Sequence, residues 1–372
     1  MRIIHCPKNI GGHPAGISKA ERAMGLDSRS VALIAPAFDF KADEILWRRR
    51  ETPLKLEYNR WKLFLRAILF YDVIHFNFGM TFMPEHIPLK QPENFRKIPR
   101  WLWLAYRAYS NILEFKDLPL LKFFGKKIFV TFQGSDIRLP DFCRKNCSIH
   151  YFDECEMDEE YINKINRKKI DVFSKYADAL FTVNPDLMHI LPSRAEFVPY
   201  AHINPNEFSP SYPDFSDNHR PRILHAPSKR NVKGTGYILE ALDKLKAEGI
   251  DFEFLLIEDM PNNDAMKHYQ KADLLIDQLL AGWYGGLSGE LMAMGKPVFC
   301  YIREDDLKFI PEEMQDDMPI INISKETLYF VLKHYLTSGR DELSALGIKS
   351  RKYVEHWHDP IKITRKLAVG AV

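Results

Sequence analysis

Short apolar runs rich in Val, Ile and Phe recur along this chain of 372 residues, and a longer amphipathic stretch follows each of them. This alternation predicts β-α units built around parallel sheets. The predicted strands are 2–6, 30–35, 73–78, 128–132, 179–183 and 195–199 in the first half, then 222–226, 252–258, 273–277, 297–302 and 319–323. Two such series predict an α/β chain with two doubly wound, Rossmann-like domains that face a central cleft.

A broken segment rich in Pro, Ser, Asp and Asn separates the two series and is the predicted linker, residues 201–221. It divides an N-terminal domain, 1–200, from a C-terminal domain, 222–355. An Asp-Pro pair at 359–360 should break the last helical stretch. We expect residues 356–372 to form a helix that packs back towards the N-terminal domain.

Composition excludes several classes of protein. Hydrophobic residues make up 46% and charged residues 27%, which is typical of soluble globular proteins. The net charge of +2 does not indicate a nucleic-acid partner. No apolar run approaches the roughly 18 residues of a membrane span, and the N-terminus leads directly into a strand. Five Cys suit a reducing compartment, so we expect a cytoplasmic protein.

Charge is unevenly distributed. Residues 41–127 hold 17 Lys and Arg against 9 Asp and Glu, together with four of the six Trp. In one interpretation, segments 48–66 and 96–107 contact an anionic membrane surface. In the other, which we favour because helices of α/β domains must bury one face, the cations face water and the apolar side chains enter the core, including Leu54, Tyr58, Trp61, Leu65 and Ile68.

The most informative segment is residues 281–301. Glycines at 285, 286 and 289 let the backbone approach a ligand, and the helix that follows presents N–H groups to an anion such as a diphosphate. Glu290 falls one turn into that helix, where its carboxylate can accept hydrogen bonds from two neighbouring sugar hydroxyls. The alternative is a plain helix-capping loop with a surface Glu.

This run resembles the nucleotide-sugar loop of glycosyltransferase family 4, retaining enzymes of the GT-B fold, whose pattern ends in Glu-Ala-Met-Ala-x-Gly-x-Pro-Val. The resemblance implies that Glu290 holds the donor ribose and that the loop binds the donor through Tyr284, Gly285, Gly286, Leu287 and Ser288. The family has a second Glu eight positions upstream, where this chain has Gly282. This departure leaves open how the hydroxyls of the donor sugar are held and whether the protein is active.

Residues 225–240 follow a strand, open a helix and resemble the family's basic pair before Lys-Gly. The resemblance implies that Arg230 and Lys233 stabilise the departing diphosphate, with Lys229 as an alternative to Arg230. Without the resemblance, these two cations could also be loop side chains that only contact water.

A glycine-rich turn follows the first strand. In the resemblance, Gly11, Gly12 and His13 line the cleft on the acceptor side; a plain tight turn is the alternative. A dinucleotide site would need another glycine spacing and an acidic residue after the second strand.

Residues 131–138 resemble the family's Thr-x-His-Gly-x-Asp-x-Arg segment. Gln133 stands in place of the His, and a glutamine cannot titrate. A retaining front-face mechanism tolerates this, because the leaving phosphate can take the acceptor's proton. Asp136 and Arg138 either line the cleft or form a structural ion pair.

Cys143, Cys147, His150 and Cys155 have the residue types of a zinc site but not a recognisable zinc spacing. Whether they bind a metal stays open, and we expect the donor chemistry to need no metal and no cofactor.

Together the resemblance implies a metal-independent, retaining hexosyltransferase that moves a sugar from a nucleoside-diphosphate-sugar to a glycan or lipid-linked acceptor, in bacterial surface polysaccharide or glycolipid synthesis. It would act in the cytoplasm, at the inner face of the membrane if the basic segments bind lipid. The alternatives are an inactive nucleotide-sugar-binding protein, favoured by Gly282 and Gln133, and a dinucleotide-dependent reductase.

Overall fold

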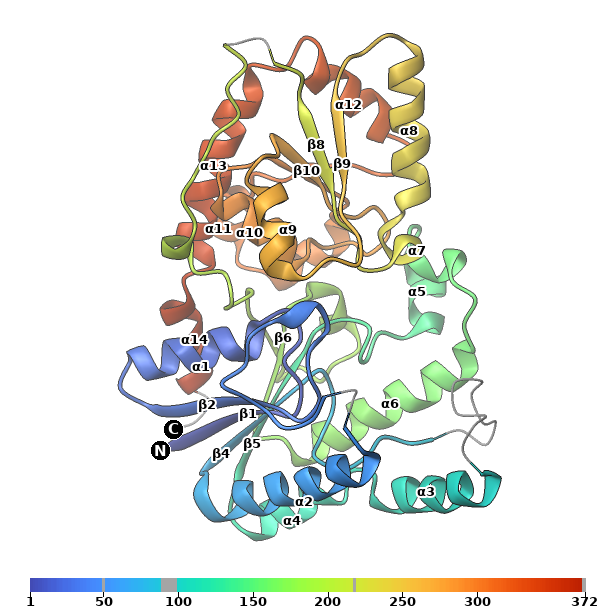
Figure 1. Ribbon diagram of the computed structural model, residues 1–372, viewed down its shortest axis with the longest axis vertical. Coiled ribbons are helices and arrows are strands. Elements are labelled where there is room, and N and C mark those ends of the chain that lie inside the picture. Colours follow the sequence, from blue (N-terminus) through green and yellow to red (C-terminus); the bar gives the residue numbers. More distant parts are fainter. Residues whose placement is uncertain (49–50, 88–98, 217–218, 370–372) are drawn as a thin grey trace.

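The computed structural model describes residues 1–48, 51–87, 99–216 and 219–369, which form two stacked α/β domains (Figure 1). Within these ranges the first domain holds a seven-stranded sheet and the second a five-stranded sheet. Every paired strand runs parallel to its neighbour. The expected fold class, two Rossmann-like domains, is therefore confirmed.

Each strand expected from the sequence overlaps a strand of the structure. The first sheet contains β1 (Arg2–Cys6), β2 (Asp27–Ala32), β3 (Glu44–Ile45), β4 (Val73–Asn77), β5 (Lys127–Phe132), β6 (Ala179–Thr182) and β7 (Glu196–Phe197). The second contains β8 (Arg222–His225), β9 (Glu253–Leu256), β10 (Leu274–Ile276), β11 (Val298–Cys300) and β12 (Ile321–Asn322). The unexpected β3 has only two residues and forms by pairing with β2.

Helices cover both faces of each sheet. In the N-terminal domain they are α1 (His13–Ala23), α2 (Pro53–Phe70), α3 (Arg100–Leu113), α4 (Asp117–Phe123), α5 (Pro140–Asn146) and α6 (Glu159–Tyr176). In the C-terminal domain they are α7 (Arg230–Lys233), α8 (Thr235–Ala247), α9 (Asn262–Tyr269), α10 (Gly286–Ala293), α11 (Glu312–Asp316), α12 (Leu328–Leu336) and α13 (Glu342–Trp357), followed by α14 (Pro360–Val369).

Strand order determines where a ligand can bind. The first sheet has the order β3-β2-β1-β4-β5-β6-β7, so the direction of winding reverses between β1 and β4. The second has the order β12-β11-β10-β8-β9 and reverses between β8 and β10. Ligands of open α/β sheets bind beyond the carboxyl ends of the strands at such a reversal. The strand order therefore predicts a ligand site at the loops after β1, β8 and β10.

The last helix, α14, lies against α1 of the first domain. Ile363 and Leu367 share a hydrophobic cluster with Ile3 and Ile17, and the Lys366 ammonium donates to the Phe197 carbonyl (3.0 Å). The chain thus returns to the N-terminal domain after completing the second. Among the helices in the described ranges, none combines the length and apolar character that crossing a bilayer requires.

Our favoured interpretation of the basic, aromatic helices is wrong for most of their apolar side chains. α2 turns Leu63, Phe64 and Ala67 into the core and leaves its other apolar stripe in solvent. In α3, Trp103 is buried while Trp101 is 71% exposed. One face of α2 suffices to cover the sheet, and α3 buries only Trp103 and Ser110, so most of the other apolar side chains of both helices stay exposed. Residues 49–50 and 96–98 of the two segments lie outside the described residues.

Candidate functional site

A cavity of about 310 Å³ lies between the domains at the expected position. Gly11 and the ring of Phe40 line it from the N-terminal domain. The C-terminal domain contributes the loops that follow β8, β9 and β10, and the cavity residues from this side include Lys233, Gly285, Gly286, Leu287 and Glu290. The two topological reversals thus meet at one cavity.

Asp277, the first residue after β10, organises the C-terminal side of this cavity. One carboxylate oxygen accepts hydrogen bonds from the Gly285 amide (2.8 Å) and the Ser288 hydroxyl (2.7 Å). The other lies 2.7 Å from the Lys233 ammonium. Burial alone would raise the pKa of the Asp277 carboxyl, but Lys233 and these hydrogen bonds outweigh it and hold the pKa below its usual value.

Sequence reasoning missed Asp277, although one signal was present. The residue ends a predicted apolar strand, which is where α/β folds place ligand-binding side chains. What could not be seen was its partner set, because Lys233 is 44 residues away in the chain. Asp277 joins the lysine loop to the glycine loop.

Glu290 lies in the first turns of α10 and is the buried carboxyl of the cavity. Burial raises its pKa to about 7. Within the described part of the chain its carboxylate has no hydrogen-bond donor, and Nε2 of His202 lies 3.8 Å away. Burial lowers the pKa of His202 to about 3, so this imidazole is neutral and the two side chains do not form an ion pair.

His202 was also missed, because it lies in the predicted linker. Its ring packs so closely on the glycine loop that a Cβ at Gly286 would lie 2.7 Å from the imidazole. His13 supports this arrangement: its Nδ1 accepts the backbone N–H of Ala201 (3.0 Å). His13 is fully buried and neutral, since burial holds its pKa well below the usual value. It fixes the segment that carries His202.

The predicted donor residues divide into two groups. Gly285, Gly286 and Leu287 line the cavity, where the first N–H groups of α10 have no intrahelical acceptor. Tyr284 and Ser288 support the loop from behind. The Tyr284 hydroxyl contacts His358 (2.9 Å) and lies fully buried, and Ser288 holds Asp277.

Of the predicted cations, Lys233 reaches the cavity and Arg230 does not. Arg230 is exposed and forms a two-point ion pair with Glu258, whose carboxylate lines the cavity rim. Lys233 ends α7, and Gly234 follows with a φ of 75°, a left-handed conformation that glycine adopts without strain. The chain can thus turn at once into α8.

Across the cavity, Gly11 contributes to the lining, and Gly12, the residue just before α1, has a φ of 74°. A Cβ at Gly12 would lie 3.4 Å from the Phe40 ring and 3.6 Å from His202. The glycine turn thus lets the first domain approach the linker closely.

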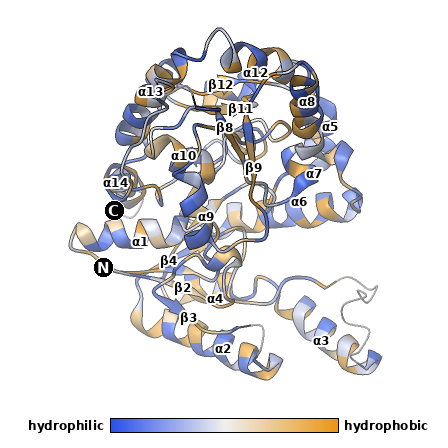
Figure 2. Ribbon diagram, turned by 45° about the horizontal axis from the view of Figure 1, so that its top comes forward, coloured by the Kyte–Doolittle hydropathy of each residue, from blue (hydrophilic) through white to orange (hydrophobic). Residues whose placement is uncertain are grey.

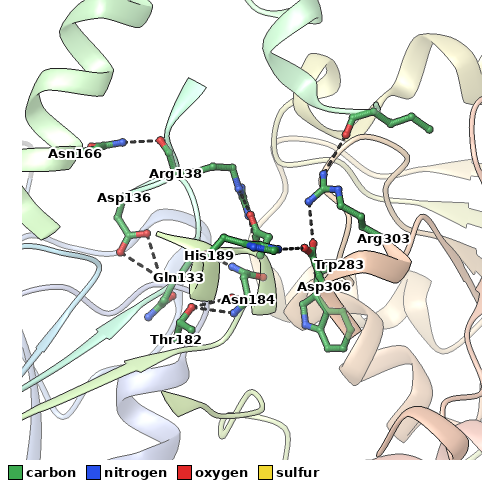
Figure 3. Close-up of polar contacts among 12 residues, drawn as sticks. Gln133, Asp136, Arg138, Asn166, Thr182, Asn184, His189, Trp283, Arg303 and Asp306 are labelled. Carbon is green, nitrogen blue, oxygen red and sulfur yellow. Dashed lines mark hydrogen bonds and ion pairs between the residues drawn. The ribbon is translucent and has the colours of Figure 1, made fainter. Parts of the chain in front are cut away.

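Gln133, Asp136 and Arg138 lie beyond β5 and do not line this cavity (Figure 3). The open alternative of an Asp136–Arg138 ion pair is wrong. Arg138 binds both carboxylate oxygens of Asp186 (2.6 and 3.1 Å), whereas Asp136 accepts the backbone N–H of Gln133 (3.1 Å). Burial raises the pKa of Asp136 to about 6. The Gln133 side-chain amide nitrogen is buried without a hydrogen-bond partner in the described residues.

Position 282, where the resembling family has Glu, is filled from the side by an arginine. A Cβ on Gly282 would lie 2.8 to 2.9 Å from three atoms of the Arg303 guanidinium. Arg303 binds Asp306 (2.9 Å) and the Ile149 carbonyl of the first domain (3.1 Å), and His189 of that domain binds Asp306 (3.0 Å) (Figure 3). A polar bridge between the domains therefore occupies this place.

Gly282→Ala is expected to lower the free energy of unfolding by about 2–3 kcal/mol, from left-handed backbone strain and crowding against Arg303. Gly249→Ala is the matched control, because Gly249 has a similar φ of 82° and open space around its Cβ position. Urea denaturation should show a larger loss for Gly282→Ala. Equal losses would mean that Arg303 does not constrain this position.

The cysteine-rich segment shows no metal centre. Among the described residues no three His, Cys, Asp or Glu side chains are placed to hold a metal ion. Cys143 is buried in a hydrophobic cluster with Tyr151 and Phe152, and Cys147 and Cys155 pack against its edge.

Comparison with known proteins supports the fold. Neither a family model nor a curated protein sequence matches the chain. Several solved structures, in contrast, match it over nearly its whole length. Anabaena HepE, in complex with UDP-glucose, superposes with a TM-score of 0.59 at 12% identity over 100% of this chain and 99% of that one. Sucrose-phosphate synthase from Thermosynechococcus elongatus gives 0.57 at 12% identity, over 99% of this chain and 98% of that one.

An α-glucosyltransferase in complex with UDP and a 13-mer DNA containing an HMU base gives a TM-score of 0.56 at 11% identity, with coverage of 100% and 99%. At 11–12% sequence identity, these structural likenesses establish only the fold. Since the likeness extends over both domains and essentially the whole of each chain, the protein has the two-domain fold of GT-B glycosyltransferases.

Proposed function

We propose that this protein is a retaining glycosyltransferase whose nucleoside-diphosphate-sugar donor binds in the interdomain cavity. The observation that carries the proposal is the buried carboxyl of Glu290, which faces the cavity, lacks a hydrogen-bond donor among the described residues and lies beside the N-terminus of α10. A buried acceptor without a partner is costly unless a ligand supplies one. Two adjacent ribose hydroxyls meet that requirement.

The diphosphate would lie over the first turn of α10, where free N–H groups and the helix dipole favour negative charge. Lys233 would stabilise the charge that grows on the leaving diphosphate. Because Asp277 holds Lys233 in place before the donor binds, the ammonium needs no reorganisation during the reaction. With a fixed cation in this position, the transfer that we propose would need no metal ion.

In the reaction we propose, the bond from the anomeric carbon to the diphosphate oxygen breaks while the acceptor oxygen bonds to the same face of that carbon. The acceptor's proton passes to the leaving phosphate oxygen. The protein then supplies positioning and charge rather than a titrating base, which is compatible with Gln133. Gly12, His13, Asp136 and Arg138 would shape the acceptor side indirectly, and Arg230 would contribute only after leaving Glu258.

The proposed donor carries a hexose, and the proposed acceptor is a glycan or is lipid-linked. The protein would act in the cytoplasm, in the synthesis of bacterial surface polysaccharide or glycolipid. A panel of UDP-, GDP-, ADP- and TDP-sugars tests its first step by thermal shift, since a ligand that binds only the folded state raises the melting temperature. We expect one nucleotide class to stand out. Analysis of the product's anomeric configuration tests retention; inversion would contradict it.

A nucleotide-sugar-binding protein without transferase activity is the second candidate. The contact between Gly282 and Arg303 favours it, because this position has no carboxylate for the donor sugar. Specific binding with no turnover across the donor and acceptor panel would establish it.

Donor affinity is expected to rise with pH, because the ribose hydroxyls donate to the ionised form of Glu290, whose pKa burial raises to about 7. Between about pH 6 and pH 8 the dissociation constant should fall by up to about tenfold. Glu290→Gln should bind more weakly and without this pH dependence. Calorimetry at both pH values measures the effect, and an unchanged slope in the variant would assign the titration to another group.

A further inference from the structure

The apolar surface of the described residues is concentrated in one place. Fourteen of the twenty large hydrophobic side chains that the structure leaves exposed lie on α2, α3, α4 or the turn after α4. We call this surface the α2–α4 face; it includes Leu54, Tyr58, Trp61, Leu65, Leu69, Phe70, Trp101, Leu104, Ile112, Leu120, Phe123 and Phe124. So many exposed apolar side chains on one face of a domain indicate an interaction site.

The pattern along α2 shows that this exposure is not a by-product of core packing. Leu54, Tyr58, Trp61, Leu65 and Leu69 recur at spacings of three and four and form one outer stripe. The opposite side of the helix is buried in the domain. α2 therefore carries two apolar faces, of which covering the sheet uses only one. Figure 2 shows the hydrophobic colouring of α2 together with its polar positions.

The three helices are linked to one another, α3 to α2 by side-chain hydrogen bonds and α4 to α2 through a shared core. The Trp61 indole donates to the Tyr109 hydroxyl (2.9 Å), and the Tyr106 hydroxyl donates to Glu57 (3.0 Å), which joins α3 to α2. α2 and α4 pack into the same hydrophobic core through Leu63 and Leu118. The interdomain cavity is lined by other elements and does not reach this face.

Cations surround this apolar surface. Residues 51–72 and 99–127 contain ten Lys and Arg against five Asp and Glu. Two of the acidic residues, Glu114 and Asp117, are buried and add little negative charge to the surface. Lys55 and Lys62 flank the outer stripe of α2. Lys55 is paired with Glu51, whereas Lys62, Arg100 and Lys116 have no acidic partner among the described residues. Arg66 and Lys122 pair with Glu44 and Asp178 from outside these ranges, and the cations without an acidic partner leave the outward charge positive.

From this combination we infer that the α2–α4 face docks on an anionic lipid bilayer. Leu and Phe side chains would enter the acyl boundary, Trp and Tyr would lie at the headgroups, and the Lys and Arg residues would contact anionic lipids. A second copy of the chain fits less well, because a two-fold interface would bring two positively charged rims together.

The position of the face is compatible with docking. α2 and α3 lie at the end of the N-terminal domain away from the C-terminal domain, so a bound membrane leaves the interdomain cavity uncovered (Figure 1). The inference goes beyond the proposed function and does not rest on it.

Co-sedimentation of the full chain with vesicles tests the inference without donor or acceptor. We expect binding to phosphatidylcholine vesicles that contain about 30% phosphatidylglycerol and much weaker binding to phosphatidylcholine alone. Lys55→Gln combined with Lys62→Gln should weaken binding to anionic vesicles by about 30-fold, and Leu54→Gln, Leu65→Gln and Leu69→Gln together by at least about tenfold.

Matched controls lie on the C-terminal domain. Lys244 and Lys267 are exposed helical lysines, and Phe330 and Ile348 are exposed apolar residues; their Gln variants should bind as the unchanged protein does. Melting temperatures verify that every variant folds. Absence of binding to anionic vesicles, or equal binding by the α2 variants, would overturn the inference. A dimer in sedimentation velocity that only the Leu variants dissociate, without vesicle binding, would assign the face to a second copy instead.

Discussion

Replacing Asp277 with alanine should lower the free energy of unfolding by about 3–5 kcal/mol, the largest stability effect that we expect in this protein. The substitution leaves the Lys233 ammonium, only 14% exposed, without its partner. It also removes the acceptor of the Gly285 amide and the Ser288 hydroxyl. Chemical denaturation followed by circular dichroism measures the loss.

A double variant separates the charge effect from the loss of packing. In Asp277→Ala with Lys233→Met no buried cation remains, so part of the lost stability should return. The loss of unfolding free energy in the double variant is compared with the sum of the losses in Asp277→Ala and Lys233→Met. If the loss equals that sum, the two side chains are not coupled. That additive result would contradict the role of Asp277 given above.

Replacing Glu290 with alanine should lower donor affinity by about 1–3 kcal/mol, roughly 5- to 150-fold in the dissociation constant. The variant loses both acceptors for the ribose hydroxyls, while the fold has no internal hydrogen bond to Glu290 to lose within its described residues. Folding stability should therefore change much less than affinity. Isothermal titration calorimetry with the nucleotide identified by thermal shift gives the comparison.

Glu258→Ala is the appropriate control, because Glu258 lines the same cavity but already binds Arg230. It should not weaken donor binding. Equal losses for Glu258→Ala and Glu290→Ala would indicate a general effect of charge on the cavity, and an unchanged constant for Glu290→Ala would remove the ribose assignment.

The fold was accessible from the sequence because each buried strand of a parallel sheet is a short apolar run that can be seen locally. β3 was not, since its two residues become a strand only by pairing with β2. The glycine loop, Lys233 and Glu290 were also visible as local patterns. The sequence places Asp277 at the end of a predicted strand, but its contacts depend on which loops the strand order brings together.

Other features depend on tertiary contacts that no local pattern contains. Arg138 pairs with Asp186, 48 residues away, rather than with the nearby Asp136. His202 reaches the glycine loop because His13 holds the preceding residue. Periodicity identified the apolar stripe that contains Leu54 and Trp61 but not its direction, because α2 has two apolar faces and the core uses the other.

Turnover of a radiolabelled nucleoside-diphosphate-sugar tests the central claim most directly. The unchanged protein should transfer or hydrolyse the sugar of the donor that stabilises it. Lys233→Met leaves the buried Asp277 carboxyl unpaired and loses stability, so it is assayed well below its own melting temperature. There it should lose most of the rate, since the leaving diphosphate would be uncompensated. Transfer by the unchanged protein with loss in the variant is the predicted result. Specific donor binding without any turnover, across the full donor and acceptor panel, would contradict the assignment as a transferase.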